Sequence, residues 1–489
     1  MTNETSTKTR PWLGLFAILA ATIMNLLDAT VVNVAGPSIR ANLGGSLASL
    51  QWIAAAYTLA LAVGLLTGGR LGDLFGRKRM LIIGVAGFLT ASLLCGLAWS
   101  PAALIGFRVL QGLFGAVMIP QTFGLIRDLF PPHQMGKAFG AFGPTIGLST
   151  ILGPVVAGAL VDADLFGTGW RMVFLINLPL GLFALIGGLR ALPEGRGTRT
   201  LSLDVAGALL AGTGLVMIVY PLVQARELGW PAWAYAMLAG AVAVLAVFVA
   251  YQVRRKRSGR TPLVELSVFR QRSYTSGVLF VLVFFGAIVG FSLSVGLVLQ
   301  LGLGFSPMHA SLTMVGWALG AFLGSAFAAT TMAKLGRNLL HIGLAGMAGG
   351  LVWLYLVFHT QGAAVHTGSL FGPLLAYGLG MGMIFVPLFD IIMGRVADHE
   401  VGSASAMLES LQQLGSSLGV AVLGTIFFTT VGVQFTPASF VHASGVIALV
   451  ALGLTVVAFG LGFLLPKRAR SAGHAPQPEV ARAGEPALV

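Results

Sequence analysis

Long apolar runs recur along this chain of 489 residues and constrain its fold more than any other feature. A helix of about 20 apolar residues spans a bilayer core and satisfies its own backbone hydrogen bonds there. Charged residues make up only 9% of the chain, against about a quarter in soluble domains. We therefore predict an all-α polytopic membrane protein. Its fourteen predicted spans are residues 12–35, 48–68, 80–99, 101–122, 137–162, 171–191, 202–223, 231–253, 274–299, 309–333, 339–360, 367–390, 402–430 and 442–465.

The placement of the 29 Lys and Arg residues predicts the orientation of these spans. With the N-terminus in the cytoplasm, the outer loops contain only Arg40, Arg171 and Arg226, and Arg108 lies inside a span. All other basic residues then fall in inner segments, as the positive-inside rule requires. An even number of spans puts both termini in the cytoplasm. The formal charge of +13 is thus a topology signal, and we expect no nucleic-acid partner.

A weak internal repeat relates the two ends of the chain. Gly76-Arg77 follows the second predicted span and Gly336-Arg337 follows the tenth, which aligns the first six spans with the last six. Transporters are commonly built from such repeats, with the substrate path between them. The predicted organisation is a cytoplasmic N-tail at 1–11, a six-helix bundle at 12–191, two inserted helices at 202–253, a basic linker at 254–273, a second six-helix bundle at 274–465 and a disordered cytoplasmic tail at 466–489.

One carboxylate, Asp28, lies inside the first apolar run. A charge at the centre of a membrane helix costs about 3 kcal/mol on insertion scales, and intramembrane acids are functional by default. Thr22, Asn25 and Asp28 are spaced three apart and share one helix face. We interpret Asp28 as a proton- or cation-binding group on a transport path. The alternative is a structural Asp that is satisfied by backbone or by a neighbouring Asn.

A basic residue, Arg108, lies inside the fourth predicted span at nearly the same depth. Arg108 follows Pro101 by about 10 Å of helix, and Asp28 precedes Gly36 by about 12 Å, both measured from the outer surface. We predict a direct or water-bridged interaction between the two charges, which lowers the cost of both. In one interpretation Arg108 holds Asp28 ionised until protonation releases it. In the other, Arg108 is a structural pin that never changes partner.

A second intramembrane acid, Glu409, belongs to a polar stripe. Ser405, Glu409, Gln412 and Ser416 follow helical spacing in the span at 402–430 and are expected to line a cavity. We predict that Glu409 is a second proton or cation site that takes part in proton coupling. The alternative is an inert, solvent-facing Glu.

Further polar and aromatic residues are candidates for the substrate cavity. Asp390 ends the span before Glu409 and either takes part in transport or is interfacial and paired with Arg395. Aromatic and Met side chains suit a promiscuous pocket. The polar cavity candidates are Asn25, Asn33, Gln111, Gln412 and Asp390, and the apolar ones are Phe284, Phe285 and Met314.

Four short motifs lie within or beside the spans. They are Gly69-x-Leu71-x-Asp73-x-x-Gly76-Arg77-Lys78; Asp28-x-Thr30-Val31-Val32-Asn33-Val34-Ala35-x-Pro37; Arg108-x-x-Gln111-Gly112; and Gly140, Ser149, Gly153-Pro154 and Ala157-Gly158. Together they resemble the motifs of the major facilitator superfamily, specifically its fourteen-helix drug:proton antiporter subfamily (EmrB/QacA-like). The resemblance covers residues 12–465 and departs from the loop motif at Leu74, where the family usually has Arg. The last motif separates exporters from importers in that family.

The resemblance implies a gating role for the loop motif Gly69, Asp73, Gly76 and Arg77. Asp73 would anchor an inner gate with Arg77 as its partner. From the residues alone, Asp73 either caps the following helix or pairs with an Arg. The alternative is a topogenic basic loop with no gating role.

The antiporter motif Gly153, Pro154 and Gly158 is expected to shape the fifth span. Pro removes one helical hydrogen bond, and Gly allows close helix approach. The resemblance implies a close interface with the span at 309–333 that seals the cytoplasmic side. The alternative is a packing kink without a gating role.

These features predict a proton-coupled multidrug efflux antiporter of the bacterial inner membrane. It would export lipophilic, often cationic compounds by alternating access. Its expected partners are drug-like small molecules, protons and the lipid bilayer, and we expect it to be a monomer. The sequence has no Walker loop, no metal-ligand spacing and no nucleophile–His–acid arrangement, so we expect no cofactor and no enzymatic activity. The alternatives are a dedicated exporter of one host-made antibiotic, peptide or siderophore, and a non-transporting membrane sensor.

Overall fold

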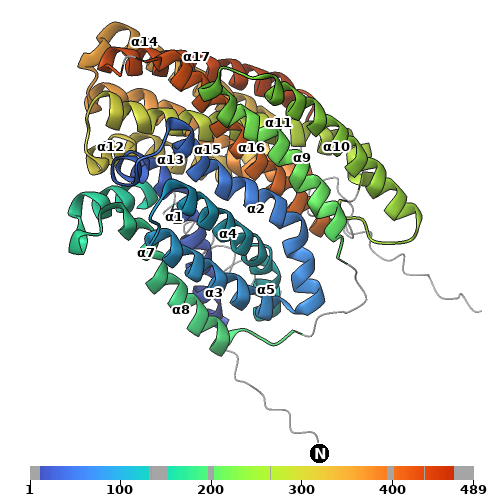
Figure 1. Ribbon diagram of the computed structural model, residues 1–489. Coiled ribbons are helices and arrows are strands. Elements are labelled where there is room, and N and C mark those ends of the chain that lie inside the picture. Colours follow the sequence, from blue (N-terminus) through green and yellow to red (C-terminus); the bar gives the residue numbers. More distant parts are fainter. Residues whose placement is uncertain are drawn as a thin grey trace, which may run out of the picture.

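The protein is a bundle of long helices (Figure 1). The computed structural model describes residues 11–131, 134, 149, 152–195, 203–264, 266–393, 401–433 and 435–466, and those residues contain helices and no strand. The α-helices are α1 (Pro11–Leu43), α2 (Leu47–Phe75), α3 (Arg77–Gly96), α4 (Pro101–Met118), α5 (Gln121–Leu129), α7 (Met172–Leu175), α8 (Asn177–Ala191), α9 (Val205–Gln224), α10 (Ala232–Arg257), α11 (Arg272–Leu297), α12 (Pro307–Thr313), α13 (Val315–Leu335), α14 (Arg337–Gln361), α15 (Thr367–Met393), α16 (Val401–Val431) and α17 (Pro437–Gly462).

Thirteen helices in the described residues are long and apolar enough to cross a membrane. They coincide with thirteen of the predicted spans, so the all-helical, multi-span fold is confirmed. The remaining predicted span, 137–162, lies largely outside the described residues. Its described part belongs to the shorter apolar helix Leu152–Ala163. The count of fourteen therefore stays a prediction.

The helices form two halves, a first half from α1 to α8 and a second half from α11 to α17 (Figure 1). The largest buried apolar cluster fills the second half, where Phe291, Trp317 and Tyr377 pack ring against ring. Two smaller clusters lie within the first half, around Phe88 and Phe174. The largest cluster also includes Leu50, Ala55 and Leu59 of α2, so apolar packing continues across the contact between the halves.

Two glycines make equivalent turns in the two halves. Gly76 joins α2 to α3 with φ of 92°, and Gly336 joins α13 to α14 with φ of 51°. Backbone with positive φ strongly favours glycine, so both turns depend on this residue type. We name the end of the bundle that carries Arg77 and the Arg254–Arg257 run the basic end, and the opposite end the far end.

The two halves meet through α2 and α16, and their hydrogen bonds lie toward the far end. Gln51 Nε2 donates to Val420 O at 3.3 Å, and Ser417 Oγ donates to Ala55 O at 3.4 Å. Nearer the middle, Ser410 Oγ donates to the carbonyl of Ala62. The halves are therefore in contact at the far end.

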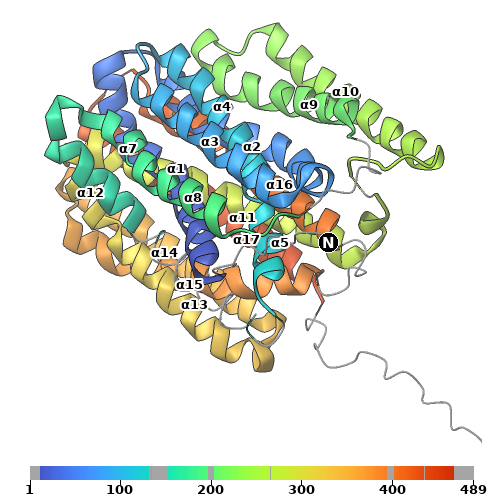
Figure 2. The same cartoon turned by 90° about the horizontal axis from the view of Figure 1, so that it is seen from below.

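The helices α9 and α10 form a hairpin on the outside of this contact. In both views the hairpin flanks α2, with α9 inside and α10 outermost (Figure 2). Glu227 Oε1, just after α9, accepts from the backbone N–H of Ala48 at 3.0 Å in the first half. Thr425 Oγ1 of the second half donates to Leu222 O at 2.6 Å. The hairpin thus touches both halves at the far end.

At the basic end, one buried carboxylate ties the hairpin to the linker that follows it. Asp204 caps α9 by accepting from Gly207 N at 2.9 Å, and it also accepts from Tyr251 Oη at 3.0 Å and Gln252 Nε2 at 2.8 Å. The linker joins this network through Leu263 N, which donates to Asp204 at 3.3 Å. Next to it, the Arg70 guanidinium of α2 donates to the Pro262 carbonyl.

The network sets the ionisation of Asp204, which lies just outside the span that begins at Val205. Burial alone raises the pKa of Asp204, but hydrogen bonds from Gln252, Gly207 and Tyr251, with Arg255 at 3.6 Å, lower it below its ordinary value. A carboxyl with a lowered folded-state pKa contributes stability above its unfolded pKa of about 4. That stability is lost as pH falls through the lower folded-state value.

We predict that Asp204→Asn destabilises the protein at pH 7 by about 1–3 kcal/mol, because buried donors lose a charged acceptor. The variant should also lose the part of the acid-induced destabilisation that wild type shows below about pH 4. Thermal unfolding in detergent across this pH range measures both effects, with the exposed Glu194→Gln as control. Equal unfolding midpoints for wild type and Asp204→Asn at pH 7 would contradict the prediction.

Candidate functional site

Asp28 and Arg108 form an ion pair inside the first half. Arg108 Nη1 contacts Asp28 Oδ2, which confirms the interaction predicted from their matched depths. Both side chains are buried, with exposures of 1% for Arg108 and 0% for Asp28. Two amides complete the shell, since Gln111 Nε2 and Asn177 Nδ2 donate to Asp28 Oδ1 at 2.7 Å and 3.1 Å. The carboxylate is therefore surrounded by donors from α4 and α8.

Arg108 has a further set of partners in α2. Its Nε donates to Ile53 O at 3.2 Å, and its guanidinium lies over the Tyr57 ring at 4.2 Å. The Tyr57 hydroxyl in turn donates to Asn25 Oδ1 on α1. The aromatic face and the carbonyl stabilise the guanidinium in addition to Asp28.

Sequence analysis missed Ser92 and Asn177 as members of this cluster. Ser92 Oγ of α3 accepts from Gln111 Nε2 at 2.8 Å and from Asn177 Nδ2 at 3.3 Å. Asn177 is the first residue of α8, after the short helix α7. Single Ser and Asn residues in apolar spans carry no spacing signal, so only the packing of α3 and α8 brings them to Asp28.

The structure corrects the predicted surroundings of Asp28. We expected a water-lined path, but the carboxylate has no exposed surface in this conformation. The predicted cavity residues Asn25 and Gln111 are likewise buried within the first half. Asn33 is partly exposed, and its carbonyl lies at the contact with Gly296 of α11. A substrate therefore has no access to Asp28 in this arrangement.

The polar stripe on α16 is more accessible. Ser405 is exposed, Glu409 and Gln412 are partly exposed, and Ser416 is buried. Exposure thus decreases along the stripe from the basic end inward. Gln412 contributes its carbonyl to Ser416 Oγ at 3.0 Å, an ordinary bond within one helix turn.

Helix geometry shows which way Glu409 faces. Successive residues turn by about 100° around a helix axis. Ser410 faces α2, and Gly415 and Gly419 pack against α11. Glu409 falls between these two faces, whereas the exposed Val422 lies on the other side of α16. Glu409 thus points to the side where the two halves face each other.

Glu409 has no hydrogen-bond or ion-pair partner among the described residues.

Two residues predicted to line the substrate cavity, Phe284 and Phe285, are buried in the second half, at 2% and 4% exposure. The prediction that they line the cavity is wrong for this conformation. Met314 is partly exposed. The side chain of Asp390 and the whole of Arg395 lie outside the described residues, so their predicted pairing is not addressed.

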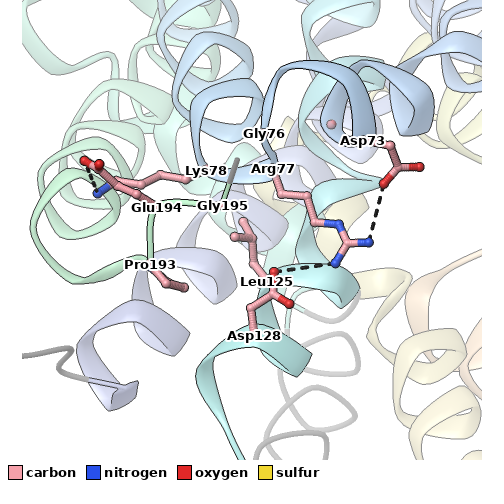
Figure 3. Close-up of a pocket in the computed structure, with 10 residues that line it drawn as sticks. Asp73, Gly76, Arg77, Lys78, Leu125, Asp128, Pro193, Glu194 and Gly195 are labelled. Carbon is pink, nitrogen blue, oxygen red and sulfur yellow. Dashed lines mark hydrogen bonds and ion pairs between the residues drawn. The ribbon is translucent and has the colours of Figure 1, made fainter. Parts of the chain in front are cut away.

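Part of the loop motif lines a cavity of about 400 Å³ at the basic end, together with residues of α5 and residues 193–195 (Figure 3). Arg77 lies between two carboxylates, Asp73 at 3.4 Å and Asp128 at 3.5 Å. On the other side of the cavity, Lys78 lies 3.9 Å from Glu194. Asp73 therefore pairs with an Arg. Among the described residues its carboxylate accepts from no backbone N–H of α3, whose N-cap is Gly76, so the alternative that Asp73 caps α3 is wrong. Asp128 was not predicted.

The second copy of the repeat uses its Arg differently. Arg337 Nη1 donates to Phe463 O and Leu465 O, both at 2.8 Å, beyond the end of α17. In the first copy Arg77 binds carboxylates instead. A Cβ on Gly69 of that copy would lie 3.7 Å from Pro120 Cβ, an ordinary contact distance. In the described residues, no three His, Cys, Asp or Glu side chains gather as metal ligands would.

The antiporter motif contacts both halves. A Cβ on Gly153 would lie 2.7 Å from Thr30 Oγ1 of α1, and one on Gly158 would lie 2.7 Å from Ser311 Oγ of α12. The implied interface with the span at 309–333 is thus present, but Gly158 packs at the far end of that span. The expected seal on the opposite, basic side is not made by this contact. Pro154 lies near the start of the helix Leu152–Ala163, and the chain just before it is outside the described residues.

Several known proteins are similar to this chain. The sequence profile of the Major Facilitator Superfamily matches residues 18–420. The "Probable actinorhodin transporter" of Streptomyces coelicolor is 49% identical over 428 residues, covering 87% of this chain and 74% of that protein. The "Multidrug efflux pump LfrA" of Mycolicibacterium smegmatis is 32% identical over 427 residues, covering 87% and 82%.

A solved structure shares the fold. The "Crystal structure of peptide transporter POT in complex with sulfate" has a TM-score of 0.67 and 17% identity, and the match covers 92% of this chain and 95% of that one. At this identity the likeness concerns the fold alone. The two-halved arrangement of helices is thus one that a solved transporter also has.

We predict that Arg108→Gln destabilises the protein by about 3–5 kcal/mol, because it leaves Asp28 buried without its cation. Adding Asp28→Asn should recover most of this loss, since the remaining neutral groups can hydrogen-bond to one another. Thermal unfolding in detergent of both single variants and the double variant forms a double-mutant cycle. Losses that simply add in the double variant would contradict a direct interaction.

Proposed function

Because this chain belongs to the Major Facilitator Superfamily, we propose that it is a proton-coupled exporter of lipophilic, often cationic small molecules. Its relatives and structural neighbours are transporters and not enzymes. The names of two relatives, a probable actinorhodin transporter and a multidrug efflux pump, support export of drug-like compounds. We assign it to the fourteen-helix antiporter subfamily, as a monomer in the bacterial inner membrane.

The proposed orientation places the basic end and both termini in the cytoplasm. In that orientation the far end faces outward. The contacts of α2 with α16, and of Gly158 with α12, then close the outer side between the halves. These contacts support an inward-facing conformation, from which outward opening would require the halves to rock apart.

The observation that carries the proposal is the position of Glu409. It is partly exposed, faces the other half and has no partner in the described part of the chain. A carboxylate in a membrane span needs a cation or a proton to offset its cost. In our proposal the Glu409 carboxylate exchanges a proton taken from outside for the cationic group of a substrate taken from inside.

Asp28 and Arg108 are assigned an indirect role in this cycle. Since Asp28 is enclosed, it exchanges protons only when the packing of α1 against α4 and α8 changes. Protonation would neutralise Asp28 and free Arg108 for its other acceptors, Ile53 O and Gln111 Oε1. The protonation of Asp28 would thus change when the helices of the first half move, although neither residue contacts the substrate.

The charge of the substrate decides which gradient drives the exchange. Moving one net charge through 100 mV yields about 2.3 kcal/mol. Because 1.4 kcal/mol corresponds to a factor of ten, one proton exchanged for a neutral substrate maintains a gradient of about fiftyfold. Exchange of one proton for one monovalent cation moves no net charge, so the pH gradient alone drives it. The loop motif is proposed as the inner gate, with Arg77 held by Asp73 and Asp128 while the basic end is open.

A dedicated exporter is the second candidate. The identity of 49% to a probable actinorhodin transporter favours it, because a single host-made compound would then be the substrate. A panel of drug susceptibilities in cells that overexpress the protein separates the two. Protection against several unrelated lipophilic cations indicates multidrug export, and protection against one chemical class indicates dedicated export.

We predict that Glu409→Gln abolishes proton release driven by substrate, with a reduction of at least tenfold. The neutral amide cannot exchange a proton for a cation. The measurement is proton flux in proteoliposomes with an imposed pH gradient, with and without ethidium as substrate. Glu194→Gln is the matched control, since it makes the same change at an exposed loop acid. A substrate-driven proton flux in Glu409→Gln equal to that of wild type would contradict the proposed role of this residue.

A further inference from the structure

At the far end, one carboxylate of the first half accepts hydrogen bonds from the second half. Asp162 lies near the end of the helix Leu152–Ala163, and its Oδ2 accepts from Ser306 Oγ at 2.6 Å. The same oxygen accepts from the backbone N–H of Met308 at 3.0 Å. The two partners follow Asp162 by 144 and 146 residues. This pair of bonds is therefore a true link between the halves.

The link continues the close packing of the antiporter motif. Gly158 lies one helix turn before Asp162, so both residues face α12. A Cβ at Gly158 would lie 2.7 Å from Pro307 O and 2.9 Å from Met308 Cα, which leaves no room for a side chain between the helices. The glycine brings α12 close enough for a short Asp side chain to reach it.

The receiving segment is fixed to the rest of the second half. His309 Nε2 and Thr313 Oγ1 of α12 lie 2.8 Å and 2.9 Å from Thr367 Oγ1, at the start of α15. A pull on α12 is thus transmitted to α15. The bonds of Asp162 consequently join the first half to the second half as a whole, and not merely to a loop.

We propose that Asp162 is a latch that holds the far end closed. Its bonds shift the equilibrium toward the state that is closed at the far end and away from the state that is open there. The proposal rests on the proposed function, because alternating access requires the halves to separate at this end. Both bonds of Asp162 break on that separation, and the Gly158 contact with α12 opens with them. The carboxylate supplies a charged acceptor, which strengthens each bond. Asp162 and Ser306 are exposed, so water screens the charge and the gain is modest.

The test uses a cysteine buried under the latch. Ser311 packs against Gly158, and only 1% of its surface is exposed. Ser311→Cys replaces one oxygen by sulfur, which is a small change. Replacing the one natural cysteine, the buried Cys95, by Ser leaves a single reporter thiol. The rate of labelling by a membrane-impermeant maleimide added outside intact cells then measures opening of the far end.

We expect Asp162→Ala to raise this labelling rate about tenfold, which corresponds to about 1.4 kcal/mol. Asp164→Ala is the matched control and should leave the rate unchanged, because Asp164 bonds within its own loop, to Gly169 N at 2.6 Å. Ser306→Ala removes one bond of Asp162 from the other side, together with the N-cap bond that Ser306 Oγ accepts from His309 N at 3.3 Å, and should raise the rate by a smaller factor. It also keeps the test decisive if Asp162→Ala fails to fold.

The outcomes separate the latch from the proposed function. Suppose that ethidium or a pH gradient changes the labelling rate of the Ser311→Cys reporter protein. If adding Asp162→Ala or Ser306→Ala to that protein leaves the rate unchanged, the latch is refuted and alternating access stands. If neither substrate nor gradient changes labelling in any variant, the proposed transport cycle fails. An equal increase for Asp162→Ala and Asp164→Ala would assign the effect to the loop charge and would also refute the latch.

Discussion

The ion pair of Asp28 with Arg108 is the interaction on which the first half depends. Two charges that leave water lose several kcal/mol of hydration each, and their attraction offsets this only with further hydrogen bonds. Those bonds join five helices, since α1 provides Asp28, α2 provides the Ile53 carbonyl, α4 provides Arg108 and Gln111, and α3 and α8 provide Ser92 and Asn177. Each helix must therefore keep its rotation and depth for the shell to stay complete. Apolar packing alone would permit sliding, because lipid and neighbouring helices are similarly apolar.

The contact between the halves has the opposite character. Its bonds run from short or amide side chains to backbone carbonyls, as from Ser417 to Ala55 and from Gln51 to Val420. No ion pair joins α2 and α16 in the part of the chain that the structure describes. Such bonds are individually weak, about 1 kcal/mol each. Buried apolar side chains of α2, among them Leu50 and Leu59, pack in the same cluster as the second half and add to this contact. Hydrogen bonds of this kind and apolar packing can both be exchanged without separating opposite charges, which suits the rocking movement that we propose.

The sequence predicts the helical spans well because span length and apolarity are set by the bilayer and not by tertiary contacts. Depth along a span also follows from helix rise, which is why the meeting of Asp28 with Arg108 was predictable. Rotation about the helix axis does not follow from depth. The water-lined surroundings expected for Asp28 were therefore wrong, and Asn177 was missed although it completes the shell. Asp128 and Asp162 were missed for another reason, since their partners lie in segments that only the fold brings near.

The two halves differ in how they treat charge, although each has a Gly-Arg turn at an equivalent place. Arg77 of the first copy is held by two carboxylates, whereas Arg337 of the second copy binds backbone carbonyls. In the first half the intramembrane acid Asp28 has its cation built in, and within the described residues Glu409 of the second half has none. A carboxylate with a built-in partner can only be switched by movement of that partner. One without a partner is open to a proton or a cation from solution. In the function that we propose, this asymmetry gives the first half a mechanical response and the second half the exchange of ligands.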